Sequence, residues 1–284
     1  MNVADAMTPR PELVTVELPG TRDDALEYLQ KGGFSSVPVV KVEDDTETFR
    51  GLVSRDSLIE NPDEDQLALL LEEVPTITQE ATVEELATLM LRERTRRVPV
   101  VNGELEGIVT ITDVIRAIAT GDADGGTEVG TVAARRINAV HAGTPLPVAE
   151  RELHYADEPY AIVLDDDAEP AGILTEVDVL AVANVVEGEE RIGDSLADDD
   201  DDWKWESIKS VGNRYLPTRN VELPTAPVSE FMTDDVVTVT KRKTAREVAQ
   251  LMIRHDIEQI PMMSGNDLVG IVQDSHLLEA LDER

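Results

Sequence analysis

The sequence predicts an α/β (α+β) fold built from four copies of one strand-helix-strand-strand-helix unit. A threonine begins each copy, and a glycine follows it after 25 to 30 residues. A helical apolar pattern and then a short apolar block that suits a strand lie between the two. The threonine and glycine pairs are Thr21 and Gly51, Thr82 and Gly107, Thr144 and Gly172, and Thr244 and Gly270.

Each unit opens with a short extended pair six residues before its threonine, and a helix follows the threonine. In the second copy Leu86, Leu89 and Met90 recur at helical spacing. The sequences from Thr82 and from Thr244 each place a glutamate three residues later, which predicts capping boxes. In the third copy Pro145 directly follows Thr144 and suits the first helical position.

Two strands and a second helix complete the unit. Residues 37–40 and 98–101 both read Val-Pro-Val-Val, residues 260–263 read Ile-Pro-Met-Met, and residues 160–163 read Tyr-Ala-Ile-Val without the proline. After a turn, each glycine begins an apolar run that predicts the second strand, and residues 113–118 exemplify the helix that follows. A unit of about 50 to 60 residues buries little surface by itself, so the units should pair.

The spacing of the units predicts two modules. The first spans residues 1–121, with motifs at about 1–60 and 70–121, and the Gly- and Asp-rich segment 122–130 should be a flexible linker. The second spans 131–284, with motifs at about 131–185 and 225–284 and an acidic insertion at 186–224. Within the insertion we expect the aspartates 198–202 to be solvated, and Trp203 and Trp205 to pack on the module.

Charge and composition exclude several functions. Subtracting 59 Asp and Glu from 25 Lys and Arg gives a net charge of −34, which repels a phosphate backbone and argues against nucleic acid as a partner. The chain has no cysteine, so disulfides and thiolate chemistry are excluded. No apolar run suits a membrane span or signal peptide, so we expect a cytoplasmic protein. The acidity, with only 6 lysines, indicates a halophilic protein adapted to molar salt.

The apolar Val-Pro-Val-Val block, followed by Gly-Ile-Val-Thr-Ile-Thr-Asp at residues 107–113, resembles CBS motifs. Two tandem CBS motifs form a Bateman module, so the chain resembles two such modules. It is similar to archaeal stand-alone CBS proteins and to the gamma subunit of AMP-activated kinase. The resemblance implies a non-catalytic sensor whose candidate ligands are AMP, ADP, ATP or S-adenosylmethionine, with no required cofactor and no metal.

The resemblance also implies the ligand-binding residues. In that family a Ser or Thr three residues after the glycine contacts phosphate, and an Asp six residues after it binds ribose. The threonine that starts the first helix, and a small residue five positions later, line the site from the partner motif. The implied residues here are Thr110, Thr112, Asp113, Thr175, Asp178, Ser54, Thr21, Thr82, Ala87, Thr144, Thr244 and Ala249, with Lys241 and Lys243 for phosphate.

The family's pairing implies which of these residues meet. Thr110 and Asp113 should face Thr21 and Leu26, and Thr175 and Asp178 should face Thr244 and Ala249 beside the lysines. Motif one carries Ser57 at the aspartate position, and motif four carries Gln273 and His276, so we expect the fourth site to be degenerate.

Structural roles stay open for the same residues. Threonines and aspartates also cap helices, residues 241–243 also suit a solvated loop, and Arg96 or Arg97 suits either a helix end or a phosphate. The leading function is a regulatory sensor that binds an adenosyl ligand, alters an unknown partner protein and forms a possible homodimer. The alternatives are an assembly module with vestigial sites and, less favoured, an enzyme related to IMP dehydrogenase, for which no room is left for a barrel.

Overall fold

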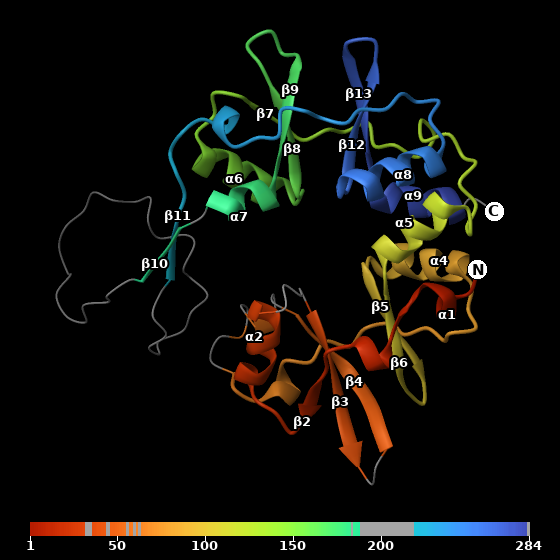
Figure 1. Cartoon of the computed structure of the whole chain (residues 1–284). Helices are drawn as coiled ribbons and strands as arrows, with labels where there is room; N and C mark the ends of the chain where they lie inside the picture. Colours follow the sequence, from red (N-terminus) through yellow and green to blue (C-terminus); the bar gives the residue numbers. More distant parts are fainter. Residues whose placement is uncertain are drawn as a thin grey trace, which may run out of the picture.

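The computed structural model describes residues 1–31, 36–43, 46–54, 57–58, 61, 64–182, 184–187 and 219–282. A first helix followed by an antiparallel strand pair recurs in four motifs, the structure describes a second helix in motifs two, three and four, and the motifs lie in two pairs (Figure 1). This confirms the α/β (α+β) fold of repeated units that the sequence predicts.

The motifs share their element order. Motif one contains β2 (Val16–Leu18), α2 (Arg22–Lys31), β3 (Ser36–Glu43) and β4 (Thr46–Ser54). Motif two contains α4 (Val83–Glu93), β5 (Arg97–Asn102), β6 (Glu104–Thr110) and α5 (Ile111–Thr120). Motif three contains β7 (Ala139–His141), α6 (Leu146–Ala156), β8 (Tyr160–Leu164), β9 (Pro170–Thr175) and α7 (Glu176–Val182). Motif four contains α8 (Ala245–His255), β12 (Gln259–Ser264), β13 (Asp267–Gln273) and α9 (Asp274–Asp282).

Short elements precede or interrupt the motifs. They are α1 (Val3–Ala6), β1 (Thr8–Pro9), the 3-10 turns η1 (Arg10–Glu12), η2 (Leu67–Leu69) and η3 (Val228–Glu230), and the paired strands β10 (Asn184–Glu187) and β11 (Arg219–Glu222). In every motif the central antiparallel pair is joined on one side by a parallel strand or bridge. The parallel partners are Val16 with Val39, Ile77 with Val100, Val140 with Val163, and Val239 with Met262.

The segment that precedes each motif crosses to the other motif of its module. The amide of Val3 donates to Ala81 in front of α4, and the amide of Glu72 donates to Leu52 in β4, both at 2.8 Å. In the second module residues 127–134 bond to motif four, and residues 226–233 bond to motif three. The two motifs of a module are therefore interlocked by exchanged segments.

The repeated glycine makes these crossings possible. A Cβ at Gly107 would come within 2.6 Å of the carbonyl oxygen of Thr8, which belongs to the crossing segment. A Cβ at Gly51 would come equally close to the Glu72 carbonyl, and Gly172 and Gly270 meet the carbonyls of crossing residues at 2.8 and 2.7 Å. Any side chain there would push the crossing segment away, so the spacing found in the sequence reflects a backbone contact.

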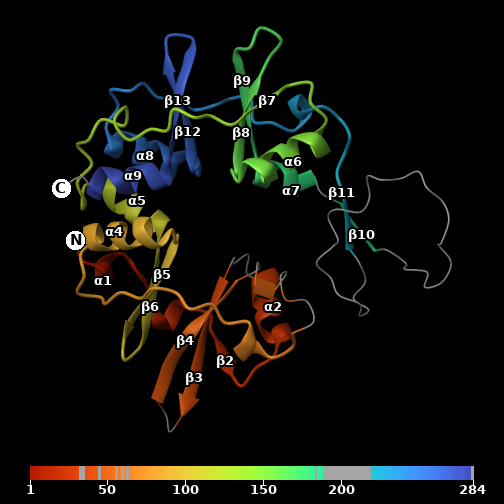
Figure 2. The ribbon, with the colours of Figure 1, turned by 180° about the vertical axis from the view of Figure 1, so that it is seen from behind.

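The two modules join through the helices of motifs two and four. Helices α4, α5, α8 and α9 lie together where the two modules meet (Figures 1 and 2). They share one apolar core, which includes Val114 and Ile118 from α5 and Leu277 from α9. Helix α5 is buried on most of its surface because it packs on its own sheet and on α8. Motifs one and three have separate cores of their own.

The segment 122–130, which we expected to be a flexible linker, is packed against motif four. Val129 is fully buried in the shared core, and its amide donates to the carbonyl of Lys243 at 2.8 Å. The segment is packed because it is the crossing segment of motif three, whose backbone bonds to motif four. The predicted aspartate run 198–202 with Trp203 and Trp205 lies outside the described residues. Among the helices that the structure describes, none has the length and apolarity that a membrane span requires.

Candidate ligand-binding sites

The strand-end threonines of motifs two and three hold the aspartates three residues later. The amide and hydroxyl of Thr110 donate to Oδ2 of Asp113 at 2.9 and 2.8 Å. The amide and hydroxyl of Thr175 donate to Oδ2 of Asp178, both at 2.8 Å. Each pair closes the start of the second helix, so the capping role exists in both motifs and fixes the carboxylate at one place.

Motifs one and four use other side chains for the same bond. The amide of Ser54 donates to the hydroxyl of Ser57 at 3.1 Å, and the amide of Gln273 donates to Nδ1 of His276 at 2.9 Å. Burial lowers the pKa of His276, although Asp274 acts in the opposite direction. The imidazole is therefore held neutral with Nδ1 as acceptor. Neither motif offers a carboxylate at this position.

Ser54 has a partner that the sequence did not reveal. Its hydroxyl donates to a carboxylate oxygen of Glu72, which lies in the crossing segment of motif two. Because Glu72 is 18 residues away and belongs to another motif, only the exchange of segments explains the contact.

The two carboxylates differ in their second oxygen. Oδ1 of Asp113 accepts a bond from Nη1 of Arg116 at 3.0 Å. No hydrogen bond from the described part of the chain reaches Oδ1 of Asp178. Asp178 therefore keeps an oxygen that no described residue occupies, whereas Oδ1 of Asp113 already accepts one bond from Arg116 and has one lone pair left.

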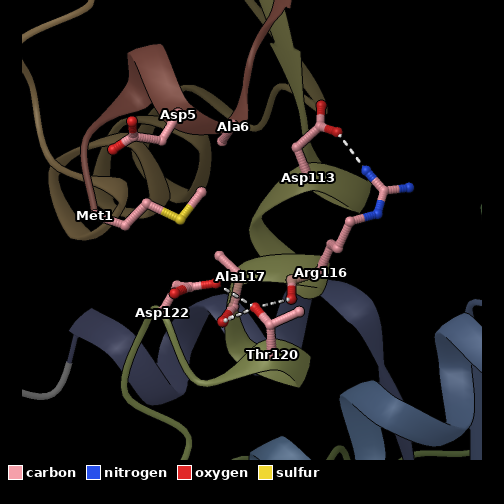
Figure 3. Close-up of a pocket in the computed structure, with 8 residues that line it drawn as sticks. All are labelled: Met1, Asp5, Ala6, Asp113, Arg116, Ala117, Thr120 and Asp122. Atoms are coloured by element: carbon pink, nitrogen blue, oxygen red, sulfur yellow. Dashed lines mark hydrogen bonds and ion pairs between the residues drawn. The ribbon is translucent and has the colours of Figure 1, made fainter.

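A cavity of about 480 Å³ lies beside Asp113, between the N-terminal segment and α5. Figure 3 shows Asp5 across the hollow from Asp113 and Arg116, with Asp122 at its lower edge. Three carboxylates and one guanidinium favour a neutral or cationic group over a phosphate.

Thr21 and Leu26, which the family's pairing places opposite Thr110 and Asp113, do not line the cavity beside Asp113. Thr21 bonds to Asp24 at 2.8 Å, and Leu26 packs against the core of motif one. The prediction that Thr110 and Asp113 face these two residues is wrong, because the crossing N-terminal segment occupies that side of α5.

Thr112 lines a different hollow from Asp113. It belongs to a cavity of about 140 Å³ between α5 and the end of α8, together with Asp256, Glu258 and Asp274. Two residues that follow one another in the sequence thus point to two different sides of α5, and the cavity at Thr112 lies between the modules.

The first helices place most of the predicted threonines as caps. The hydroxyls of Thr82 and Thr244 each accept the amide three residues later at 3.2 Å, which confirms both capping boxes. Near Thr244, the hydrogen bond from Lys243 and the amide of Thr244 lower the pKa of Glu247 to about 2.

Thr144 does not take this position. Helix α6 begins one residue later than expected, with Pro145 as its N-cap. The bridge that joins Thr82 to Asn2 in motif two is formed in motif three by Pro145 and Pro227. The register of motif three is therefore shifted by one residue, and Glu150 rather than Ala149 corresponds to Ala87.

Ala87 and Ala249 lie in the core between the modules. Both are fully buried, and both belong to the cluster that α4, α5, α8 and α9 share. Small side chains at buried helix positions let neighbouring helices approach, and the expectation that they leave room for a base stays a prediction. The predicted meeting of Thr175 and Asp178 with Thr244 and Ala249 is wrong, since motif three has a separate core.

Motif four approaches the third motif's site through another residue. Nε2 of Gln273 donates to the carboxylate of Glu158 at 3.1 Å, next to Tyr160. Tyr160 pairs directly with Thr175 across β8 and β9 and is almost fully buried, and burial raises its pKa to about 12.

The basic run at residues 241–243 lies at the start of α8 beside the crossing segment. Nζ of Lys243 pairs with Glu247 at 2.7 Å, whereas Lys241 is exposed. The carbonyl of Lys241 accepts the amide of Gly130 at 3.0 Å. Their closest backbone partners are thus in the segment between the modules.

Comparison with known proteins agrees with motifs one, two and four of the repeat. Residues 3–64, 68–120 and 228–283 match the family model described as the CBS domain, which together cover more than half of the chain. The uncharacterized protein MJ1404 of Methanocaldococcus jannaschii is 24% identical over 272 residues, which are 95% of this chain and 59% of that protein. The chain thus spans about three fifths of the length of this relative.

Two solved structures resemble nearly the whole chain. An uncharacterized conserved protein from Pyrococcus horikoshii has a TM-score of 0.70 and 28% sequence identity. The match covers 99% of this chain and 100% of that protein's chain. The protein MJ1225 of Methanocaldococcus jannaschii, proposed as an archaeal homologue of g-AMPK, has a TM-score of 0.64 with 19% identity and 99% coverage of both chains, a likeness of fold. Because the CBS domain model matches more than half of its residues, the chain belongs to the CBS domain family.

Proposed function

We propose that the chain is a non-catalytic regulatory sensor that binds an adenine nucleotide or adenosyl ligand and alters the state of a partner protein. The observation that carries the proposal is the recurrence of one Thr-Asp arrangement at the strand ends of motifs two and three. A carboxylate held in this way offers an acceptor to the two vicinal hydroxyls of a ribose.

Motif three supports the proposal better than motif two. Oδ1 of Asp178 accepts no hydrogen bond from the described part of the chain, whereas Oδ1 of Asp113 accepts one from Arg116. Glu158 and Glu176 stand close to this site, since the amide of Glu176 donates to Pro159. Because these carboxylates repel phosphate, we expect AMP and S-adenosylmethionine to bind more tightly than ADP or ATP.

Isothermal titration calorimetry in molar KCl tests the proposal with the four ligands and the full chain. We expect saturable heat for AMP or S-adenosylmethionine. Asp178→Ala should weaken that affinity about tenfold to a hundredfold, because hydrogen bonds to a charged acceptor are lost. Asp113→Ala, tested in the same way, should have the smaller effect if motif three is the main site.

Two further variants separate binding from capping. Asp178→Asn keeps an oxygen for the amide of Thr175 but removes the charge, so helix α7 stays capped while affinity falls. Asp167→Asn is the matched control, because Asp167 is an exposed carboxylate of the same motif. Absence of saturable heat for all four ligands, or equal affinity in wild type and Asp178→Ala, contradicts the proposal and leaves an assembly module.

A further inference from the structure

A cluster of cations stands at one edge of motif four in a chain that is otherwise strongly acidic. We call Arg135, Lys241, Arg242, Lys243 and Arg246 the basic edge. Residues 128–136 and 241–247 together hold six Lys or Arg and two Glu, a local charge of +4 against −34 for the whole chain. The ligand site proposed above uses none of these residues.

Backbone contacts hold the two segments of the basic edge together. The amides of Val129 and Gly130 donate to the carbonyls of Lys243 and Lys241 at 2.8 and 3.0 Å. A Cβ at Gly130 would come within 2.7 Å of Lys241, so only glycine permits this approach. Nη2 of Arg135 donates to the carbonyl of Gly130 at 2.9 Å, which places its guanidinium beside Lys241.

Most of these charges are not neutralised by the protein. Lys243 pairs with Glu247, and within the described ranges the hydrogen bonds of Arg135 go to the carbonyls of Gly130 and Val269. Lys241, Arg242 and Arg246 are exposed and form no ion pair with any residue that the structure describes. Elsewhere the described arginines 10, 92, 96 and 116 have carboxylate partners.

We propose that the basic edge docks a carboxylate-rich segment of a protein partner. Guanidinium groups match carboxylates in bidentate geometry, and three of the five cations are arginines. A nucleic acid is disfavoured because its long backbone would extend beyond this small patch into a strongly negative field. Residues 128–136 also connect the modules, so a partner held there contacts the connection that changes if the modules move.

Fluorescence anisotropy with a labelled peptide of eight glutamates and the full chain tests the proposal. The titration uses the lowest KCl concentration at which circular dichroism shows the native fold, and it is repeated with added KCl. We expect saturable binding that weakens as salt rises. The double variant Lys241→Glu with Arg242→Glu should bind about tenfold more weakly or not at all.

The control reverses two exposed arginines of the first module, Arg50→Glu with Arg94→Glu. It has the same net charge as the test variant and should stay within about twofold of wild type. If the test variant loses its fold, Arg242→Gln replaces it and should still weaken binding. Equal binding of peptides of eight glutamates and eight glutamines, equal losses in test and control variants, or tighter binding of an eight-nucleotide DNA strand overturns the proposal.

Discussion

Arg96 of motif two forms a bidentate ion pair with Asp274 of motif four across the boundary between the modules. Its Nη1 and Nη2 atoms donate to the two carboxylate oxygens at 3.1 and 2.6 Å, and Nη2 also lies 3.0 Å from Glu258. Burial acts to lower the pKa of Arg96, but Asp274 and Glu258 raise it overall. The side chain of Asp274 is only 8% exposed, so it depends on this cation.

Removing the cation should destabilise the junction. Arg96→Ala leaves Asp274 buried without a counter-charge and should lower the free energy of unfolding by about 2 kcal/mol, below the full cost of a buried pair because Arg96 is half exposed. Urea unfolding in molar KCl measures this. Arg92→Ala, which removes an exposed pair with Glu93, should change stability by about 0.5 kcal/mol at most. Equal losses of stability in Arg96→Ala and Arg92→Ala contradict the role of Arg96 as the counter-charge of the buried Asp274.

The alanine at position 249 should be required for helix packing. Ala249→Leu adds volume to the core between the modules and should cost about 1 to 3 kcal/mol of unfolding free energy. Glu150→Leu places the same side chain at the corresponding position of α6, outside that core, and should change stability by about 0.5 kcal/mol or less. Thermal unfolding of both variants measures the difference, and a tolerated Ala249→Leu shows that the position faces open space.

The shifted register of motif three has its own consequence for the threonines. Thr82→Val removes a cap and should cost about 1 kcal/mol. Thr144→Val should cost about 0.5 kcal/mol or less, because Pro145 begins helix α6 and Thr144 precedes it. Chemical denaturation of the two variants provides the comparison, and equal costs argue for an unshifted register.

His276 should make stability depend on pH. Its pKa in the folded protein lies below 6.5, so the unfolded chain takes up the proton first as pH falls. The stability that neutral His276 gives the folded protein is fully present above about pH 6.5, and it is lost as the pH falls through the pKa of His276 in the folded protein. Unfolding midpoints measured between about pH 7.5 and 5.5 should fall less in His276→Asn, whose amide oxygen still accepts from Gln273. Parallel curves for the two proteins contradict this.

The repeat and its elements could be predicted from the sequence because they depend on local patterns. Apolar periodicity and the capping boxes at Thr82 and Thr244 locate the helices, and the structure has them there. The glycine spacing was visible as well, although its cause was not. The backbone carbonyl of Thr8 packs against Gly107 so closely that no side chain fits there. The two residues are almost 100 positions apart, so no local pattern encodes this contact.

The parts that failed depend on which faces meet in space. Ala87 suits a ligand pocket or a helix interface equally well in sequence, and its full burial in the apolar core of α4, α5, α8 and α9 could not be read from the local pattern. The one-residue shift at Pro145 was hidden because Thr144 fits the repeat by spacing alone. Glu72 as partner of Ser54 follows from the exchange of segments, which single-motif reasoning does not contain.

Hydrogen exchange measured with and without S-adenosylmethionine or AMP locates the ligand most directly. The account predicts slower exchange of the amides at residues 172–181, around Thr175 and Asp178, with a smaller effect at 107–116. Protection confined to other parts of the chain, or none at saturating ligand, contradicts it.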